Sequence, residues 1–127
     1  MMINLVIPAE VRVFIFQCVE AMWADGYDAP RDILASIKGV KLEEMKRSRD
    51  RGLCCGAGGA RMFMEEKIGE RINIERTKEA LSLNPDVIAS ACPFCMTMLT
   101  DGVKAEDAID RVEVKDIAEI LLEAVEA

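Results

Sequence analysis

Two cysteine pairs constrain this chain more than any other feature of its sequence. Cys54 and Cys55 are adjacent, and Cys92 and Cys95 follow 36 intervening residues later. Adjacent cysteines make a poor disulfide, because their Cα atoms lie about 3.8 Å apart across a trans peptide, whereas a relaxed bridge needs roughly 5.5 Å. The pattern therefore predicts a metal ion or a cluster that the cysteines share.

Length and composition bound the class of protein. The 127 residues, 51% of them apolar and 31% charged, are typical of one globular domain that is large enough to bury a core. Acidic residues outnumber basic ones by 23 to 16, which gives a net charge of −7. Because phosphate backbones repel such a chain, we expect no nucleic-acid partner. The same charge permits docking to a basic protein surface.

The cysteine count and the N-terminus indicate a cytoplasmic protein. Five cysteines without a secretory signal argue for a reducing compartment, where thiols persist as ligands. Residues 1–8 lack the basic region of a signal peptide, and no segment reaches the ~20 apolar residues of a spanning helix. We therefore expect a soluble protein, or one that is peripheral to a membrane complex.

The chain contains no histidine. This excludes Cys₂His₂ zinc, His-ligated haem and any Cys-His or Ser-His catalytic pair. Chemistry must come from sulfur, from carboxylates or from a bound cofactor, and no catalytic residue is predicted.

The hydrophobic pattern predicts alternating strands and helices. We expect strands over residues 11–16, 40–45, 86–91 and 112–114. We expect helices over 30–37 with Asp28 as N-cap, over 62–83 with Ile68 and Ile72 on one face, from Pro93 through Leu99, and over 116–127 with Ile117, Ile120, Leu121 and Val125 on its apolar face. This order indicates an α/β fold: a small, mostly parallel sheet flanked by helices in Rossmann-like layers, with ligands at the strand ends.

Gly56, Gly58 and Gly59 follow the first cysteine pair and are candidate cofactor-binding residues. Without side chains they let backbone amides approach a cluster, and they can adopt the positive φ values of a backbone nest around an anion. The alternative is an ordinary turn. The stretch matches neither of the glycine-rich nucleotide-binding loops.

Cys92 and Cys95 flank the first turn of a predicted helix, where free N–H groups and the helix dipole favour thiolates. Taken alone, this pair also fits a thioredoxin-like redox motif. The methionines near the cysteines in sequence are interpreted as apolar packing that shields the site. Arg61 is interpreted as a surface salt-bridge residue.

The fifth cysteine completes a longer pattern. Cys18 lies 35 intervening residues before Cys54, so that the chain reads Cys, then Cys-Cys-Gly, then Cys-Pro-Phe-Cys. This arrangement resembles the CCG domain, the cysteine-rich module found in heterodisulfide reductase and in the iron-sulfur subunits of glycolate and lactate oxidases. The resemblance is carried by 52–59, 62–73 and 91–102 within one domain spanning 1–127. Residues 1–26 diverge, because Cys18 keeps the family's spacing but not its neighbouring residues.

The resemblance implies an iron-sulfur electron-transfer module of a heterodisulfide reductase-like or quinone-linked oxidoreductase. A [4Fe-4S] cluster, noncubane in heterodisulfide reductase, would be held by Cys18, Cys54, Cys55, Cys92 and Cys95. The implied partners are other oxidoreductase subunits, either flavoproteins or ferredoxin-type iron-sulfur proteins, with a homo-oligomer as a further arrangement.

Two other interpretations stay open. In some branches of the family the motif holds structural zinc, and four thiolates satisfy a tetrahedral zinc ion whereas Cys18 would exceed it. The chain would then be a non-catalytic, zinc-stabilised interaction module. It could also be an α/β protein of such a complex that holds no metal.

The number of motifs limits what the chain can do alone. Family members that transfer electrons generally carry two CCG motifs and a ferredoxin-like segment, whereas this chain has one motif and no such segment. We therefore expect a separate subunit or a piece of a longer protein, which is not catalytic by itself.

Overall fold

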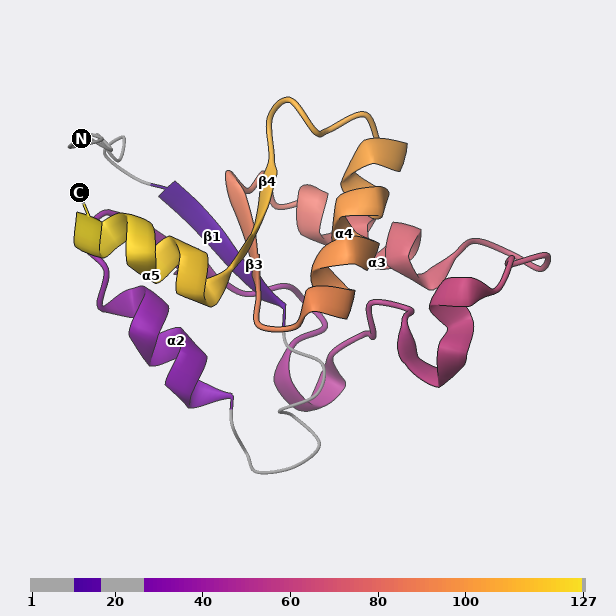
Figure 1. Cartoon of the computed structure of the whole chain (residues 1–127), viewed down its shortest axis with the longest axis horizontal. Helices are drawn as coiled ribbons and strands as arrows, with labels where there is room; N and C mark the ends of the chain where they lie inside the picture. The colour runs from indigo at the N-terminus through magenta and orange to yellow at the C-terminus, as the bar shows by residue number, and fades with distance from the viewer. Residues whose placement is uncertain (1–10, 17–26, 127) are drawn as a thin grey trace.

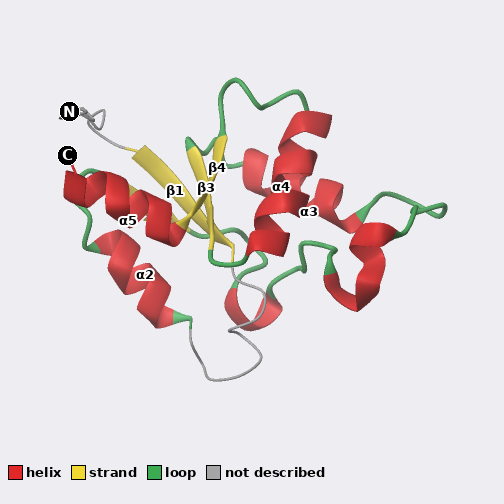
Figure 2. Cartoon of the chain, in the orientation of Figure 1, coloured by secondary structure: helices red, strands yellow, loops and turns green. Residues whose placement is uncertain are grey.

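Four parallel strands form one sheet in the order β2-β1-β3-β4 (Figure 2). The structure is a computed structural model that describes residues 11–16 and 27–126. The strands are β1 (Val11–Phe16), β2 (Val40–Glu43), β3 (Val87–Ser90) and β4 (Glu113–Asp116). Because all four run the same way, their carboxyl ends meet at one edge, as the alternating sequence pattern predicts.

Helices cover both faces of the sheet (Figure 1). One face carries α2 (Asp28–Ala35) and α5 (Ile117–Glu126), and the other carries α3 (Ile72–Leu81) and α4 (Pro93–Ala105). Two 3₁₀ segments, Arg49–Arg51 and Gly58–Phe63, lie in the long connection between β2 and α3. The predicted α/β class and the helix-flanked parallel sheet are confirmed.

The central strand β3 is buried along its whole length, as expected of a parallel strand covered on both sides. Its side chains alternate between two cores. Val87 and Ala89 belong to the core under α2 and α5, whereas Ile88 belongs to the core under α3 and α4. The second core is the larger, and it includes the buried thiols of Cys55 and Cys95.

The helix predicted over 62–83 is wrong in its first part, because helix α3 begins only at Ile72. Gly59 and Ala60, just before the predicted start, have positive φ values of 64° and 62°, and Gly69 has a φ of 74°. An α-helix cannot pass through left-handed residues. Ile68, expected to share a buried face with Ile72, is 86% exposed.

The ends of two other helices also differ from expectation. Helix α2 begins at Asp28, so Tyr27 rather than Asp28 is the N-cap. The Asp28 carboxylate instead accepts a hydrogen bond from Arg49 at 2.8 Å. In α5 the apolar face is only partly buried, because Ile117 and Ile120 are covered whereas Leu121 and Val125 are 39% and 74% exposed.

No helix within residues 27–126 is long and apolar enough to cross a membrane. Cys18, the fifth predicted ligand, lies outside the described residues.

Candidate metal centre

The second cysteine pair is held at the point where β3 ends and α4 begins. Cys92 is the N-cap of α4, and Pro93 occupies the first turn, as predicted. The Cys92 N–H donates to Ser90 Oγ at 3.3 Å, and the Cys92 carbonyl accepts from the Met96 N–H at 3.0 Å. Pro93 suits this position, since a helix leaves its first N–H groups unbonded and proline has none to lose. Both thiols therefore lie at the positive end of a 13-residue helix.

The first cysteine pair lies in the connection between the two 3₁₀ segments. Gly56 follows it with a φ of +89°, which is a conformation that favours glycine. The Gly56 N–H donates to Cys54 Sγ at 3.3 Å. Hydrogen bonds of this kind stabilise the thiolate form of a cysteine and tune the potential of an iron-sulfur centre.

The two pairs line the same open pocket, whose volume is about 320 Å³. Its walls are mostly apolar, and it is lined by Cys54, Cys55, Ala57, Gly58, Ala60, Met62, Phe63, Cys92, Phe94 and Cys95. The fold thus brings together four cysteines that are up to 41 positions apart in the sequence. The volume lies at the lower end of the range of small-molecule sites, roughly 300–1,000 Å³.

Each pair contributes one buried and one half-buried thiol. Cys55 and Cys95 are each 2% exposed and belong to the core under α3 and α4. Cys54 and Cys92 pack against that core from the pocket side. All four are thiols rather than disulfides.

The thiols surround the pocket rather than meet at one point. Within residues 27–126, no three side chains of histidine, cysteine, aspartate or glutamate come close enough together to bind a single ion. A thiolate donor set around an apolar cavity fits a multi-atom iron-sulfur group, which such ligands bind.

The three predicted glycines take different positions. Gly58 lines the pocket, with open space where a side chain would project. Gly59 has a φ of +64° and also faces open space. Gly56 packs inward instead: a Cβ there would lie 3.2 Å from both the Ile72 Cβ and the Asn73 backbone nitrogen.

Other predictions for neighbouring residues can be compared with the structure. Arg61 forms the expected surface salt bridge, with Glu66 at 3.0 Å. Met62 lines the pocket and Met98 is buried in the core, in agreement with apolar packing. Met64 is 61% exposed, so its predicted shielding role is wrong.

Two aromatic side chains at the pocket were not predicted from the sequence. Phe63 is 82% exposed and Phe94 is 58% exposed, although both line the pocket. Phe94 stands between the two cysteines of the second pair, and this adjacency is the signal that could have identified it. Phe63 lies in the stretch that was wrongly predicted to be helical.

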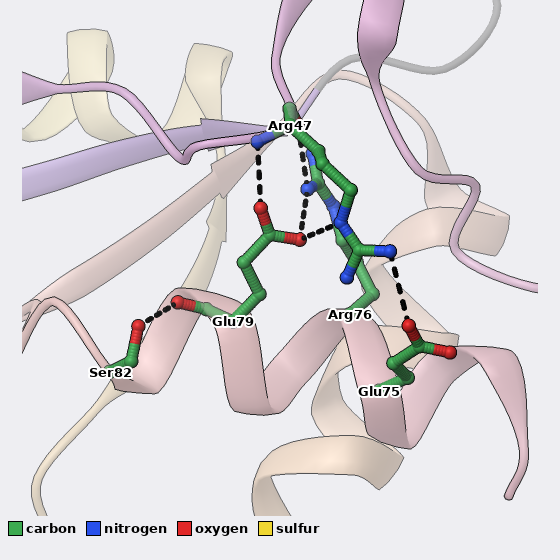
Figure 3. Close-up of polar contacts among 5 residues, drawn as sticks. All are labelled: Arg47, Glu75, Arg76, Glu79 and Ser82. Atoms are coloured by element: carbon green, nitrogen blue, oxygen red, sulfur yellow. Dashed lines mark hydrogen bonds and ion pairs between the residues drawn. The ribbon is translucent and has the colours of Figure 1, made fainter.

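A polar cluster on α3 was also missed, because the charges over 65–79 were interpreted as a solvated helix face. Arg76 is 2% exposed, and its guanidinium donates to the Arg47 carbonyl at 2.8 Å and to Glu79 at 2.9 Å (Figure 3). Glu79 also accepts from the Arg47 backbone N–H at 2.7 Å and from Arg47 Nε at 2.9 Å. The cluster ties α3 to the segment that leads toward the first cysteine pair.

The pKa of Glu79 reflects these contacts. Burial alone would raise it, but the hydrogen bonds from the Arg47 N–H and from Arg76, together with the charges of both arginines, outweigh burial. The pKa of Glu79 therefore lies below its ordinary value.

Several known proteins share this arrangement in sequence. The probable iron-sulfur-binding oxidoreductase FadF of Bacillus subtilis is 51% identical over 116 residues, which cover 91% of this chain and 16% of that protein. The EtfAB:quinone oxidoreductase of Syntrophomonas wolfei is 45% identical over 107 residues, with 79% and 15% covered. A subunit of the dihydromethanophenazine:CoB--CoM heterodisulfide reductase of Methanosarcina barkeri is 41% identical over 99 residues, with 77% and 24% covered.

This chain spans about a quarter or less of the length of those three relatives. No solved structure matches it. The profile of the cysteine-rich domain family, CCG, matches residues 13–100, which include all five cysteines. Since this match covers well over half of the chain, the protein belongs to the cysteine-rich CCG domain family.

Proposed function

We propose that this chain is an iron-sulfur electron-transfer module of a heterodisulfide reductase-like or quinone-linked oxidoreductase. The observation that carries the proposal is the convergence of Cys54, Cys55, Cys92 and Cys95 on one apolar pocket. Relatives named as iron-sulfur-binding and quinone oxidoreductases and as part of a heterodisulfide reductase support it. We infer a [4Fe-4S] cluster, although the donor set alone does not distinguish a cubane from a noncubane form.

The residues of the chain have separable parts in this proposal. The four thiolates would hold the cluster, which supplies a site that accepts and releases one electron. The N-terminus of α4 offers positive potential to Cys92 and Cys95. The apolar walls exclude water, which strengthens the electrostatic effect of every nearby N–H group on the potential.

Cys18 is proposed as the fifth ligand, and the sheet register supports this. Phe16 at the end of β1 is paired with Ser90 at the end of the neighbouring parallel strand β3. In the sequence, Cys18 comes two residues after Phe16, just as Cys92 comes two residues after Ser90. The chain therefore leaves β1 toward Cys18 at the same sheet edge at which it leaves β3 toward Cys92.

The proposed partners are other subunits or domains of an oxidoreductase, of the flavoprotein or ferredoxin type. The length of the relatives supports this, since each carries several times as much chain as this module. Electron transfer needs a donor and an acceptor, and a single module of this size supplies neither. We propose a cytoplasmic location, which suits thiolate ligands because a reducing compartment keeps them unoxidised.

Anaerobic purification followed by iron and acid-labile sulfide analysis tests the proposal. We expect roughly four irons and four sulfides per chain, visible absorption, and an EPR signal in one oxidation state. Single Cys→Ser variants at positions 54, 55, 92 and 95 should each lose most of the cluster. The matched control is Met62→Leu, which changes another sulfur-bearing residue of the pocket and should keep full iron content.

Other outcomes identify the alternatives. A colourless chain that remains free of iron after cluster reconstitution overturns the proposal. One equivalent of zinc, with unfolding on chelation, would establish the zinc-stabilised interaction module instead. A Cys18→Ser variant with undiminished iron content would remove Cys18 from the site while leaving the four-cysteine proposal intact.

A further inference from the structure

Gly56 is wedged between the two helices that lie behind the cysteine pocket. A Cβ at Gly56 would lie 3.2 Å from the Ile72 Cβ and from the Asn73 nitrogen on α3, and 3.5 Å from the Met98 Cε on α4. Contacts of 3.2 Å are tighter than ordinary van der Waals separations. The backbone of Gly56 therefore packs directly against the first turn of α3 and the middle of α4.

The wedge fixes the direction in which the Gly56 amide points. With a φ of +89°, its N–H turns back onto Cys54 Sγ at 3.3 Å. A small rotation of this peptide would lengthen or break the bond, because hydrogen bonds weaken steeply as the donor angle falls. The position of α3 relative to α4 thus determines whether Cys54 receives its hydrogen bond.

Asn73 links those two helices at this point. Its Nδ2 donates to the Met98 carbonyl at 3.0 Å across the interface, and the residue is 2% exposed. Asn73 is also the residue whose backbone nitrogen contacts Gly56. The same residue therefore touches both the glycine behind Cys54 and the helix that carries Cys92 and Cys95.

Asn73 is a poor stabiliser in energetic terms. Its Oδ1 is buried and has no hydrogen-bond partner among the described residues. An unsatisfied buried acceptor costs about 1–3 kcal/mol, which offsets what one amide hydrogen bond contributes. Stability alone therefore gives little physical reason for an amide rather than an apolar side chain at this position.

We propose that Asn73 is a positioning residue: through its bond to Met98 it holds Gly56 against α3 and α4, so that the Gly56 N–H stays directed at the Cys54 sulfur and sets the reduction potential of the bound cluster. This inference rests on the proposed function for its effect on potential, but its geometric part concerns the chain alone. A donor to a ligand sulfur stabilises the more negative, reduced cluster, so loss of the bond lowers the potential.

The first measurement is the midpoint potential of the anaerobically prepared protein, followed by EPR. We expect Asn73→Leu to bind full iron but to shift the reduction equilibrium roughly tenfold toward the oxidised form, about 59 mV more negative for a one-electron couple. The matched control is Thr77→Val. Thr77 lies one turn further along α3, is fully buried, and also has a hydroxyl without a hydrogen-bond partner in the described part of the chain, but it is not among the nearest neighbours of Gly56. Its potential should equal that of the parent.

The second measurement is amide hydrogen exchange of Gly56 in the metal-free, reduced protein, followed by NMR. In Asn73→Leu the exchange of this amide should accelerate roughly tenfold or more, as expected when a protecting hydrogen bond is lost. In Thr77→Val it should stay within about twofold of the parent, the scatter of ordinary local opening.

Each result bears on the inference. An unchanged potential in an iron-loaded Asn73→Leu variant overturns it while leaving the proposed function standing. Equal shifts in Asn73→Leu and Thr77→Val also overturn it, because they would show a general effect of α3 packing. If the parent binds no cluster, the proposed function fails, and unchanged Gly56 exchange in Asn73→Leu then overturns the geometric part as well.

Discussion

Gly102 on α4 lies so close to Thr77 on α3 that a Cβ on Gly102 would come within 2.0 Å of the Thr77 hydroxyl oxygen. The same Cβ would lie 3.1 Å from the Asn73 carbonyl oxygen, which belongs to the backbone and cannot rotate away. Glycine in a helix interior usually costs about 1 kcal/mol relative to alanine. Here that cost allows two helices to approach more closely than any side chain would permit.

Replacing Gly102 by alanine should therefore destabilise the protein, although alanine is the better helix former. Overpacking costs of about 1–3 kcal/mol or more, set against a gain of about 1 kcal/mol in propensity, should leave a net loss of about 2 kcal/mol. Urea unfolding of the metal-free protein by circular dichroism measures this. Gly58→Ala, which has no atom within 4 Å of the new Cβ, should change the midpoint very little, and an equal effect of the two variants would contradict the close approach.

The polar cluster on α3 should make Glu79 matter far more than its neighbour Glu75. Glu79 is 12% exposed and accepts three hydrogen bonds from Arg47 and Arg76, so Glu79→Gln should cost about 2 kcal/mol at pH 7. Glu75 is 51% exposed and pairs with Arg47 alone, so Glu75→Gln should cost less than about 0.5 kcal/mol. Chemical denaturation of both variants checks the contrast.

The same pair of variants tests the pKa of Glu79. Because this pKa is lowered by folding, the carboxylate stabilises the folded state above its ordinary pKa of 4.5, and that contribution disappears as the pH falls through the lower folded value. The difference in unfolding free energy between parent and Glu79→Gln should therefore be full at pH 7 and shrink progressively below about pH 4.5. A difference that stays constant down to about pH 3 would refute the lowered pKa.

The burial of the thiols predicts an order of chemical modification. In the metal-free, reduced protein, iodoacetamide should label Cys54 and Cys92 at least about tenfold faster than Cys55 and Cys95, since only the first two are accessible from the pocket. Timed quenching and peptide mass spectrometry give the four rates. Uniform labelling under native conditions, at the rate seen in urea, would contradict the packing of Cys55 and Cys95 in the core.

Two isoleucines with opposite surroundings test the exposed segment before α3. Ile68→Ala should leave the free energy of unfolding within about 0.5 kcal/mol of the parent, because this side chain is 86% exposed. Ile88→Ala in β3 should cost about 2–5 kcal/mol, because that side chain is fully buried. A large effect at Ile68 would instead support the helix predicted from the sequence.

The parts of the fold that the sequence predicted correctly are those with local signals. Strand β3 is a short apolar run bounded by Pro85 and Cys92, and α4 begins at a proline, so the position of the second cysteine pair followed from adjacent residues. The helix expected over 62–71 failed for the opposite reason. Ala60 adopts a φ of 62°, and nothing in the helical propensity of alanine announces that conformation.

The contacts that shape the candidate site could not be predicted, because they join distant segments. Gly56 was selected for its closeness to the cysteines, but its packing against Asn73 and Met98 depends on how α3 and α4 cross. The burial of Arg76 depends likewise on the carbonyl of Arg47, which is 29 positions away. A pattern of charges every three or four residues looks the same whether water or another segment faces it.

The placement of Cys55 and Cys95 in the apolar core has a consequence for assembly. Their positions are fixed by the same packing that holds Leu99 and Val103, so half of the donor set is preorganised by the fold itself. Little conformational entropy then remains to be lost when a ligand group enters, in contrast to a small zinc domain that folds only around its ion. Insertion of the group should thus resemble the filling of a finished receptacle, and the chain should keep its secondary structure when the group is removed.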